Sequence, residues 1–326
     1  IMNLFYNPDF IAHFSSRGPV SPFYMKPDMV APGAYINTTQ IGSSYNFTSG
    51  TSFAAPHVSG AAALLLEKNP ELENHELKSL LVTTTQPVSN AYGNEFSIHE
   101  SGSGRLDIAS AYNAKLIINP TNFVINFSSD NKVIEKELKL KVIQNELRKI
   151  DVNFEGPEFI EFKHEINGNN LQVKFIIVGE KYGKYEGKMY INHEKIRYTI
   201  PIIIHFTEGS ISTYQENEKL FFEINHPDEW SFTKISITNS KNGNSETVTT
   251  TSEKTPSIEI YENAEYWIEA KIMTNGSTTD AFDMVKVSSV SEKAEVLELR
   301  NIPEKQIIII ISIIIIIGII GLLIRK

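Results

Sequence analysis

The stretch GTSFAAPHVSGAAALLLEK occupies residues 50–68, and Asn69-Pro70 follows it. It predicts a helix from Ser52 to about Lys68. The helix ends at Asn69-Pro70 because the residue before a proline is disfavoured in the helical conformation. Residues 61–66 are apolar on every face of that helix, which predicts that the helix is buried on all sides.

Four segments stand in order along the first part of the chain: FSSRGP at 14–19, KPDMVAPG at 26–33, GTSFAAPHVSG at 50–60, and SGRLD at 103–107 with Ala109. Together they closely resemble the subtilase family of serine proteases, and the third matches the family's nucleophile motif at nearly every position. The resemblance covers residues 1–115, about a third of the 326-residue chain. It implies that 1–115 is the C-terminal part of a subtilase catalytic domain, an α/β fold with part of a doubly wound parallel sheet.

The resemblance makes Ser52 the catalytic nucleophile, and the local physics agrees. A serine at the start of a helix has an unpaired backbone N–H, and the positive helix end favours an oxyanion there. Pro56 is expected in the first turn, where no N–H needs an intrahelical partner. By resemblance, Thr51 supports the oxyanion site. The alternative is that Ser52 merely caps the helix, but the match of the whole motif favours the nucleophile.

The partners of this nucleophile are not recognisable in the sequence. The family places its catalytic Asp and His, and an oxyanion Asn, upstream of the serine, and their signatures are absent from the 51 residues before Ser52. His57 lies about 140° around the predicted helix from Ser52, so we expect it to pack rather than to accept a proton. Asp9 and His13 stand four residues apart in no matching context, which disfavours them as a triad pair. We expect this fragment to be inactive by itself.

Asp28 lies in a family-like turn and is expected to be structural, with Arg17 as its ion-pair partner.

Charge and composition exclude several kinds of site. No cysteine is present, which excludes disulfides and thiolate sites. Calcium binding is common in the family, but no cluster has metal-ligand spacing, so no cofactor is predicted. The net charge of −9, without a Lys/Arg cluster, argues against a nucleic-acid partner.

The organisation of the chain changes near residue 115. Before it, a second helix is predicted from about Asn74 to Thr84. After it, short alternating runs predict strands, about seven of them in 116–207, the size of a fibronectin-type or Ig-like β-sandwich. A second all-β stretch at 208–300 is predicted to be another β-sandwich, with a turn at Asn242-Gly243. Residues 301–306 are a linker.

Residues 307–324 read IIIIISIIIIIGIIGLLI and predict one transmembrane helix, since 18 residues at about 1.5 Å each span about 27 Å. Arg325 and Lys326 are expected to form a cytoplasmic tail, although the positive-inside rule favours this only weakly, because Arg300 and Lys305 lie on the other side of the span. The expected location is a cell membrane, single-pass, with the N-terminus outside.

Four Asn-x-Ser/Thr triplets, at Asn37, Asn46, Asn126 and Asn275, fit an external location. Asn126 and Asn275 are the favoured glycan sites, because Asn46 lies close to Ser52.

The predicted function is that of a membrane-anchored, extracellular subtilisin-like serine endopeptidase, which acts on peptides or proteins through an acyl-enzyme on Ser52. The alternative is a non-enzymatic cell-surface scaffold or adhesin built on a decayed protease domain.

Overall fold

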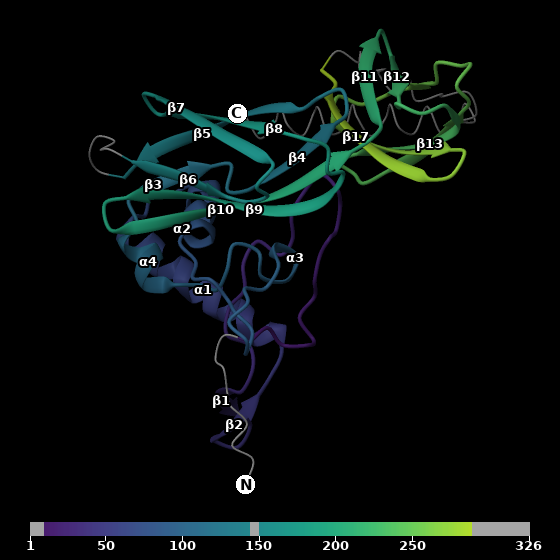
Figure 1. Ribbon diagram of the computed structural model, residues 1–326. Helices are drawn as coiled ribbons and strands as arrows, with labels where there is room; N and C mark the ends of the chain where they lie inside the picture. Colours follow the sequence, from purple (N-terminus) through teal and green to yellow (C-terminus); the bar gives the residue numbers. More distant parts are fainter. Residues whose placement is uncertain (1–9, 144–149, 289–326) are drawn as a thin grey trace, which may run out of the picture.

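The computed structural model describes residues 10–143 and 150–288, and Figure 1 shows how they are arranged. The helical region, residues 10–115, contains β1 (Ile36–Gln40), β2 (Ser44–Thr48), α1 (Thr51–Lys68), α2 (Asn74–Thr83), α3 (Ile98–Ser101) and α4 (Ile108–Asn113). The first β region, residues 116–207, contains β3 (Leu116–Asn119), β4 (Phe123–Ser128), β5 (Val133–Val142), β6 (Asp151–Glu155), β7 (Ile160–Asn167), β8 (Asn170–Ile177), β9 (Gly183–His193) and β10 (Ile196–Thr207). The second β region, residues 208–288, contains β11 (Ser210–Glu216), β12 (Lys219–Asn225), β13 (Trp230–Asn239), β14 (Ser245–Thr250), β15 (Ser257–Glu259), β16 (Glu265–Thr274) and β17 (Thr278–Lys286).

Helix α1 confirms the predicted helix but not its burial. Ala61 and Leu65 are buried, whereas Leu64 is 43% and Leu66 is 37% exposed. The helix packs against α2 and α4, which cover only part of it. The prediction of burial on all sides is therefore wrong for the described residues, because an apolar run indicates that a helix needs cover without specifying its neighbours.

The doubly wound parallel sheet expected for residues 1–115 is not formed among the described residues of the helical region. Strands β1 and β2 pair antiparallel as a hairpin, and the parallel pairing is limited to one bridge between Val30 and Arg105. A parallel sheet is built from neighbouring strands joined by crossover helices, and one bridge does not extend into such a sheet. The predicted helical content, in contrast, is confirmed by α1 and α2.

The first β region consists of two four-stranded sheets, in the orders β4-β10-β9-β6 and β3-β5-β8-β7. Leu138, Leu140 and Phe175 from one sheet share a core with Ile202 and Ile204 from the other. The alternation predicted for β5 and β8 is confirmed, and eight strands lie where about seven were predicted. The two sheets therefore stabilise each other by burying one face each.

The helical region and the first β region share this core. Ala61, Leu65 and Leu80 of the helices belong to the same buried cluster as the strand residues. In Figure 1 the helices lie against the sheet that contains β9 and β10. The hydroxyl of Ser79 in α2 donates to the Ile118 carbonyl at 2.9 Å and accepts from the Ile118 N–H at 2.8 Å. Helix α2 is thus fixed to β3 by packing and by a reciprocal pair of hydrogen bonds.

The second β region has a separate core. Its sheets have the orders β11-β12-β15 and β14-β13-β16-β17, and Leu220, Phe222, Ile235 and Ile268 are buried between them. The predicted turn at Asn242-Gly243 joins β13 to β14. The packing fits the architecture predicted for this stretch, while the domain boundaries themselves remain predictions.

The predicted membrane segment, linker and tail, residues 301–326, lie outside the described residues. Among residues 10–143 and 150–288, no helix is both long and apolar enough to cross a membrane.

Candidate active site

The four motif segments, far apart in the sequence, are joined by backbone hydrogen bonds. The Gly18 N–H donates to the His99 carbonyl at 2.8 Å, which ties the first segment to α3. The Val30 N–H donates to the Gly104 carbonyl at 2.9 Å, which ties the second segment to the fourth. The Gly50 N–H donates to the Gly33 carbonyl at 2.7 Å, which ties the second segment to the residue before α1. The nucleophile motif is therefore held from outside its own helix.

Glycine is required where these segments cross. Gly102 has a φ of 62°, and a Cβ there would lie 2.4 Å from the Asp28 carbonyl oxygen. At Gly33 an added Cβ would lie 2.9 Å from the Gly50 carbonyl oxygen. A side chain at either position would push apart the segments that support the start of α1.

Ser52 lies in the first turn of α1 and is exposed, as is Thr51. Gly50 is the N-cap, and its carbonyl accepts from the Phe53 N–H at 3.0 Å. No hydrogen bond joins the Ser52 hydroxyl to another residue within 10–143 and 150–288, so the hydroxyl is open to an incoming group. The helix N-terminus favours negative charge at this point, as the sequence predicted.

Pro56 is placed differently from the prediction. Because α1 begins at Thr51, Pro56 is its sixth residue and not part of the first turn. A proline there removes the N–H that would donate to the Ser52 carbonyl, four residues earlier. The backbone around Ser52 consequently has one intrahelical hydrogen bond fewer than a regular helix.

The predicted packing role of His57 is supported by its contacts. Its Nδ1 donates to the Phe53 carbonyl at 2.8 Å, four residues earlier in the same helix. A ring committed to the carbonyl of its own helix is not aimed at the Ser52 hydroxyl. His13 is exposed and contacts the Phe14 ring, and Asp9 lies outside the described residues. Among the described residues, therefore, no histidine is hydrogen-bonded to Ser52.

The expected Arg17–Asp28 ion pair is not formed. Arg17 pairs with Glu100 at 2.8 Å, while Asp28 pairs with Lys78 at 2.7 Å and with Lys26. Burial raises the pKa of Asp28, but the hydrogen bonds and charges of Lys26 and Lys78 outweigh it, so the net shift is downward. Asp28 is thus an ionised structural carboxylate that links the second segment to α2, a partner that sequence order alone does not reveal.

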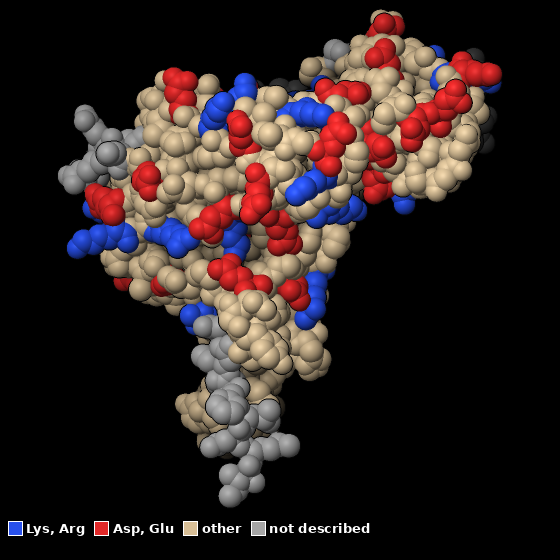
Figure 2. Space-filling view, in the orientation of Figure 1, with Lys and Arg blue, Asp and Glu red and all other residues tan. Residues whose placement is uncertain are grey.

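The surface next to Ser52 is uncharged. No Asp, Glu, Lys or Arg occurs between Asp28 and Glu67, a range that includes the hairpin β1–β2 and most of α1. Tyr45 and Phe47 on β2 are 70% and 65% exposed, and Figure 2 shows no charged side chain over the visible surface at this end. The site therefore offers a neutral, partly aromatic surface beside an exposed serine.

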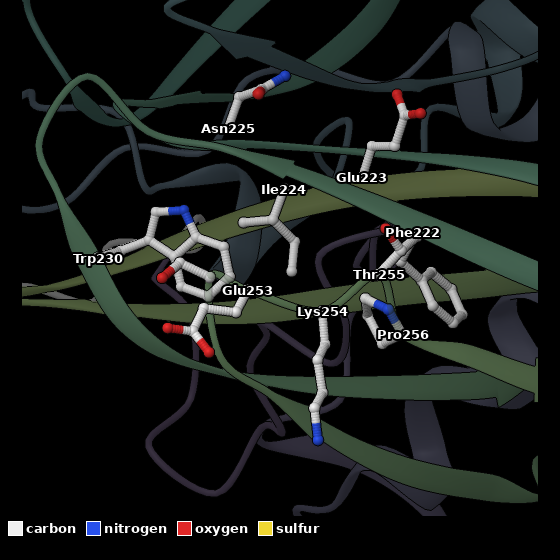
Figure 3. A pocket seen from close by; sticks show the side chains of 10 residues that line it. Phe222, Glu223, Ile224, Asn225, Trp230, Glu253, Lys254, Thr255 and Pro256 are labelled. Atoms are coloured by element: carbon white, nitrogen blue, oxygen red, sulfur yellow. The ribbon is translucent and has the colours of Figure 1, made fainter.

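Other candidate sites are weaker. A pocket of about 270 Å³ lies in the second β region, between β12, β13 and residues 252–256, and in Figure 3 Ile224 and Trp230 face each other across it. Its hydroxyl residues, Ser252 and Thr255, form no hydrogen bond with the charged side chains that line it among the described residues. Within the described ranges no group of three His, Asp or Glu residues is placed to hold a metal ion.

Comparisons with known proteins agree with the motif segments. Residues 6–104 match the subtilase family. The subtilisin-like protease SBT1.6 of Arabidopsis thaliana is 38% identical over 135 residues, 34% of this chain and 18% of that protein. The minor extracellular protease Vpr of Bacillus subtilis (strain 168) is 26% identical over 57% of this chain and 24% of its own length.

The similarity to subtilases therefore lies in residues 6–104, and the chain spans about a fifth of the length of these relatives. Among solved structures, a two-domain fibronectin type-III segment of chicken tenascin covers 47% of this chain and 92% of its own, at 12% identity and a TM-score of 0.22. That score is too low to establish a shared fold for the β regions.

Proposed function

We propose that Ser52 is the nucleophile of a subtilisin-like serine endopeptidase. The observation that supports this most strongly is the exposed Ser52 hydroxyl at the start of α1, in a motif held by the Gly33–Gly50 hydrogen bond. Ser52 Oγ attacks the carbonyl carbon of a peptide bond, and the Ser52 N–H stabilises the resulting oxyanion. The amine leaves, and water then hydrolyses the acyl-enzyme.

The general base in this proposal comes from protein sequence outside this chain. His57 is engaged with its own helix, and a subtilisin-like mechanism needs a histidine that is oriented by a carboxylate. Thr51, also exposed at the helix start, supports the oxyanion site. The substrates are peptides or proteins, and the chain as given is inactive.

A fluorophosphonate probe tests the nucleophile. A protein that also contains the upstream Asp and His should be labelled at Ser52, and the Ser52→Ala variant should not. Ser59→Ala is the matched control, because Ser59 is an exposed serine in the same helix. Loss of the nucleophile in an enzyme of this family lowers turnover about a million-fold. The chain 1–326 alone should remain unlabelled.

The outcome also separates this proposal from the non-enzymatic alternative. Labelling at Ser52 that Ser52→Ala removes supports the protease. An intact upstream Asp and His with no labelling supports the scaffold, and strong labelling of chain 1–326 contradicts the external base.

We further propose that residues 307–324 anchor the protein in a cell membrane, with the N-terminus outside and Arg325 and Lys326 in the cytoplasm. The supports are the length of the apolar run and the two cations after it. Protease added to intact cells should release a soluble fragment that ends near residues 301–303. Protection of the β regions until lysis would contradict this orientation.

A further inference from the structure

An aromatic joint holds the second β region against the helical region. Phe23 stacks on Trp267 of β16 with ring centroids 5.8 Å apart, and its edge meets Phe282 of β17 at 6.1 Å. Tyr24 contacts the same Trp267 at 5.2 Å. These rings come from segments about 240 residues apart in sequence, and each aromatic pair contributes beyond its buried area.

His205 of β10 lies where the first β region meets this joint. It is 6% exposed, and its ring centroid lies 5.0 Å from that of Phe282. Its Nδ1 donates to the side-chain oxygen of Asn126 on β4 at 2.8 Å. The same strand places Ile203 against Met25 and Ile98 of the helical region. His205 therefore contacts the first and the second β region and lies beside the helical region.

Three titratable or charged side chains face His205 from the elements packed around it. Lys184 on β9 and His99 on α3 disfavour a positive charge on the ring, whereas Asp280 on β17 favours it. Lys184 also pairs with Asp280 at 3.6 Å, which offsets the attraction of that carboxylate. Burial is the largest influence, and with these charges it lowers the pKa of His205 to about 4 from an ordinary value of 6.5. His205 is therefore neutral at pH 7 when the joint is closed.

We propose that this joint is an acid-sensitive latch: protonation of His205 favours release of the second β region from Phe23 and Tyr24. The joint opens because an imidazolium beside Phe282 and Lys184 is poorly solvated, and opening exposes it to water. The lowered pKa belongs to the closed state, so the stability of the closed joint is greatest above pH 6.5 and falls as the pH drops toward 4. A pKa gap of about 2.5 corresponds to a shift of about 300-fold toward the open joint. This inference does not depend on the chemistry of Ser52.

Tryptophan fluorescence of chain 1–326 tests the latch. The chain has two tryptophans, Trp230 and Trp267, so Trp230→Phe leaves Trp267 as the single reporter at the joint. Between pH 7.5 and 3.5, emission should shift to longer wavelength and acrylamide quenching should increase. Far-UV circular dichroism, recorded in parallel, should remain unchanged through that transition, because opening separates the joint without unfolding either sheet.

Variants in the same background separate the latch from a purely structural role. His205→Gln removes the titrating group and should abolish the acid transition. Asn126→Asp places a carboxylate beside the ring, which stabilises the imidazolium in the closed state, and should also suppress it. His164→Gln, at an exposed histidine of β7, is the control and should leave the transition unchanged.

Three results would overturn the proposal: no change at Trp267 before the far-UV signal is lost, an unaltered transition in His205→Gln, or opening of Asn126→Asp at the original pH. If His205→Gln is already open at pH 7.5, Asn126→Asp decides the question, because it retains the histidine. Suppression there supports the latch.

Discussion

The two β regions differ in how their sheets are covered. In the first, β10 is buried on both faces, by the opposite sheet and by residues of the helical region such as Met25 and Ile98. In the second, the main core lies between its own two sheets. Strand β10 therefore packs against both the opposite sheet and the helical region. The first β region and the helical region therefore form one packing unit. The second β region is attached to this unit by the aromatic joint and by polar contacts such as the ion pair of Lys184 with Asp280.

Truncating a buried side chain in either core is expected to change the free energy of unfolding most. Phe175 and Ile268 are each fully buried, the first in the shared core and the second in the separate core. Phe175→Ala should lower the free energy of unfolding by about 3–5 kcal/mol, and Ile268→Ala by about 2–5 kcal/mol. Urea denaturation followed at 222 nm should show the helices destabilised by Phe175→Ala alone. Equal loss of helical signal in both variants would mean that the two cores unfold as one.

Ser79→Ala tests the polar link between α2 and β3. The variant leaves the Ile118 N–H without its acceptor in a buried position, which should cost about 1–3 kcal/mol. Ser59→Ala serves as the control, since Ser59 is exposed on α1 and donates only to the carbonyl of Ala55. A difference in urea midpoint of less than the experimental error between the two variants would show that the link is dispensable.

A third change concerns Glu76, a carboxylate of α2 that is only 3% exposed and pairs with Lys141 on β5. Burial raises the pKa of Glu76, but hydrogen bonds from Lys141 and from the Glu73 N–H outweigh it, so the pKa lies below its ordinary 4.5. Its contribution to stability is complete above pH 4.5 and is lost as the pH falls through the lowered value. Glu76→Gln should therefore flatten the decline in stability below pH 4.5. If the stability of Glu76→Gln falls below pH 4.5 as steeply as that of the parent protein, the decline is due to other carboxylates.

The smallest effect is expected at the β13–β14 turn of the second β region. Gly243 has a φ of 75°, which an alanine adopts with strain, so Gly243→Ala should cost about 1 kcal/mol. Because the two cores are separate, thermal unfolding of the second β region should shift while that of the first stays in place. Gly60→Ala is the comparison variant, since Gly60 lies in α1 with open space at its Cβ.

The sequence predicts elements better than it predicts their neighbours. Helix α2 and the alternating strands followed from periodicity, and α1 from an apolar run that ends at Asn69-Pro70. The four motif segments located Ser52 at the helix start. The run Ile200–Ile204 is apolar throughout, however, and such a run does not show which layer covers each face of a strand. The ion pair of Arg17 with Glu100, rather than with Asp28, depends on chain crossings that no local pattern contains.

The structure also revises one expectation about modification. The sequence favours Asn126 as a glycan site, but its side chain accepts the hydrogen bond from buried His205. Asn46 and Asn275 are exposed, so they present their side chains more openly. A triplet motif contains no information on whether its asparagine is engaged inside the fold.

Helix α3 carries a consequence for the order of events during synthesis. Its first N–H, at Ile98, donates to the carboxylate of Glu186 in β9 at 2.8 Å, 88 residues later in the chain. At about 5–20 residues per second, a ribosome delivers that carboxylate roughly 4 to 18 seconds after Ile98 has been made. During this interval the nascent helical region lacks both the carboxylate that accepts from the Ile98 N–H and the sheet that it packs against. Its final shape is consequently set after translation of the first β region, and a pause between codons 98 and 186 would lengthen the exposure of α1 to chaperones.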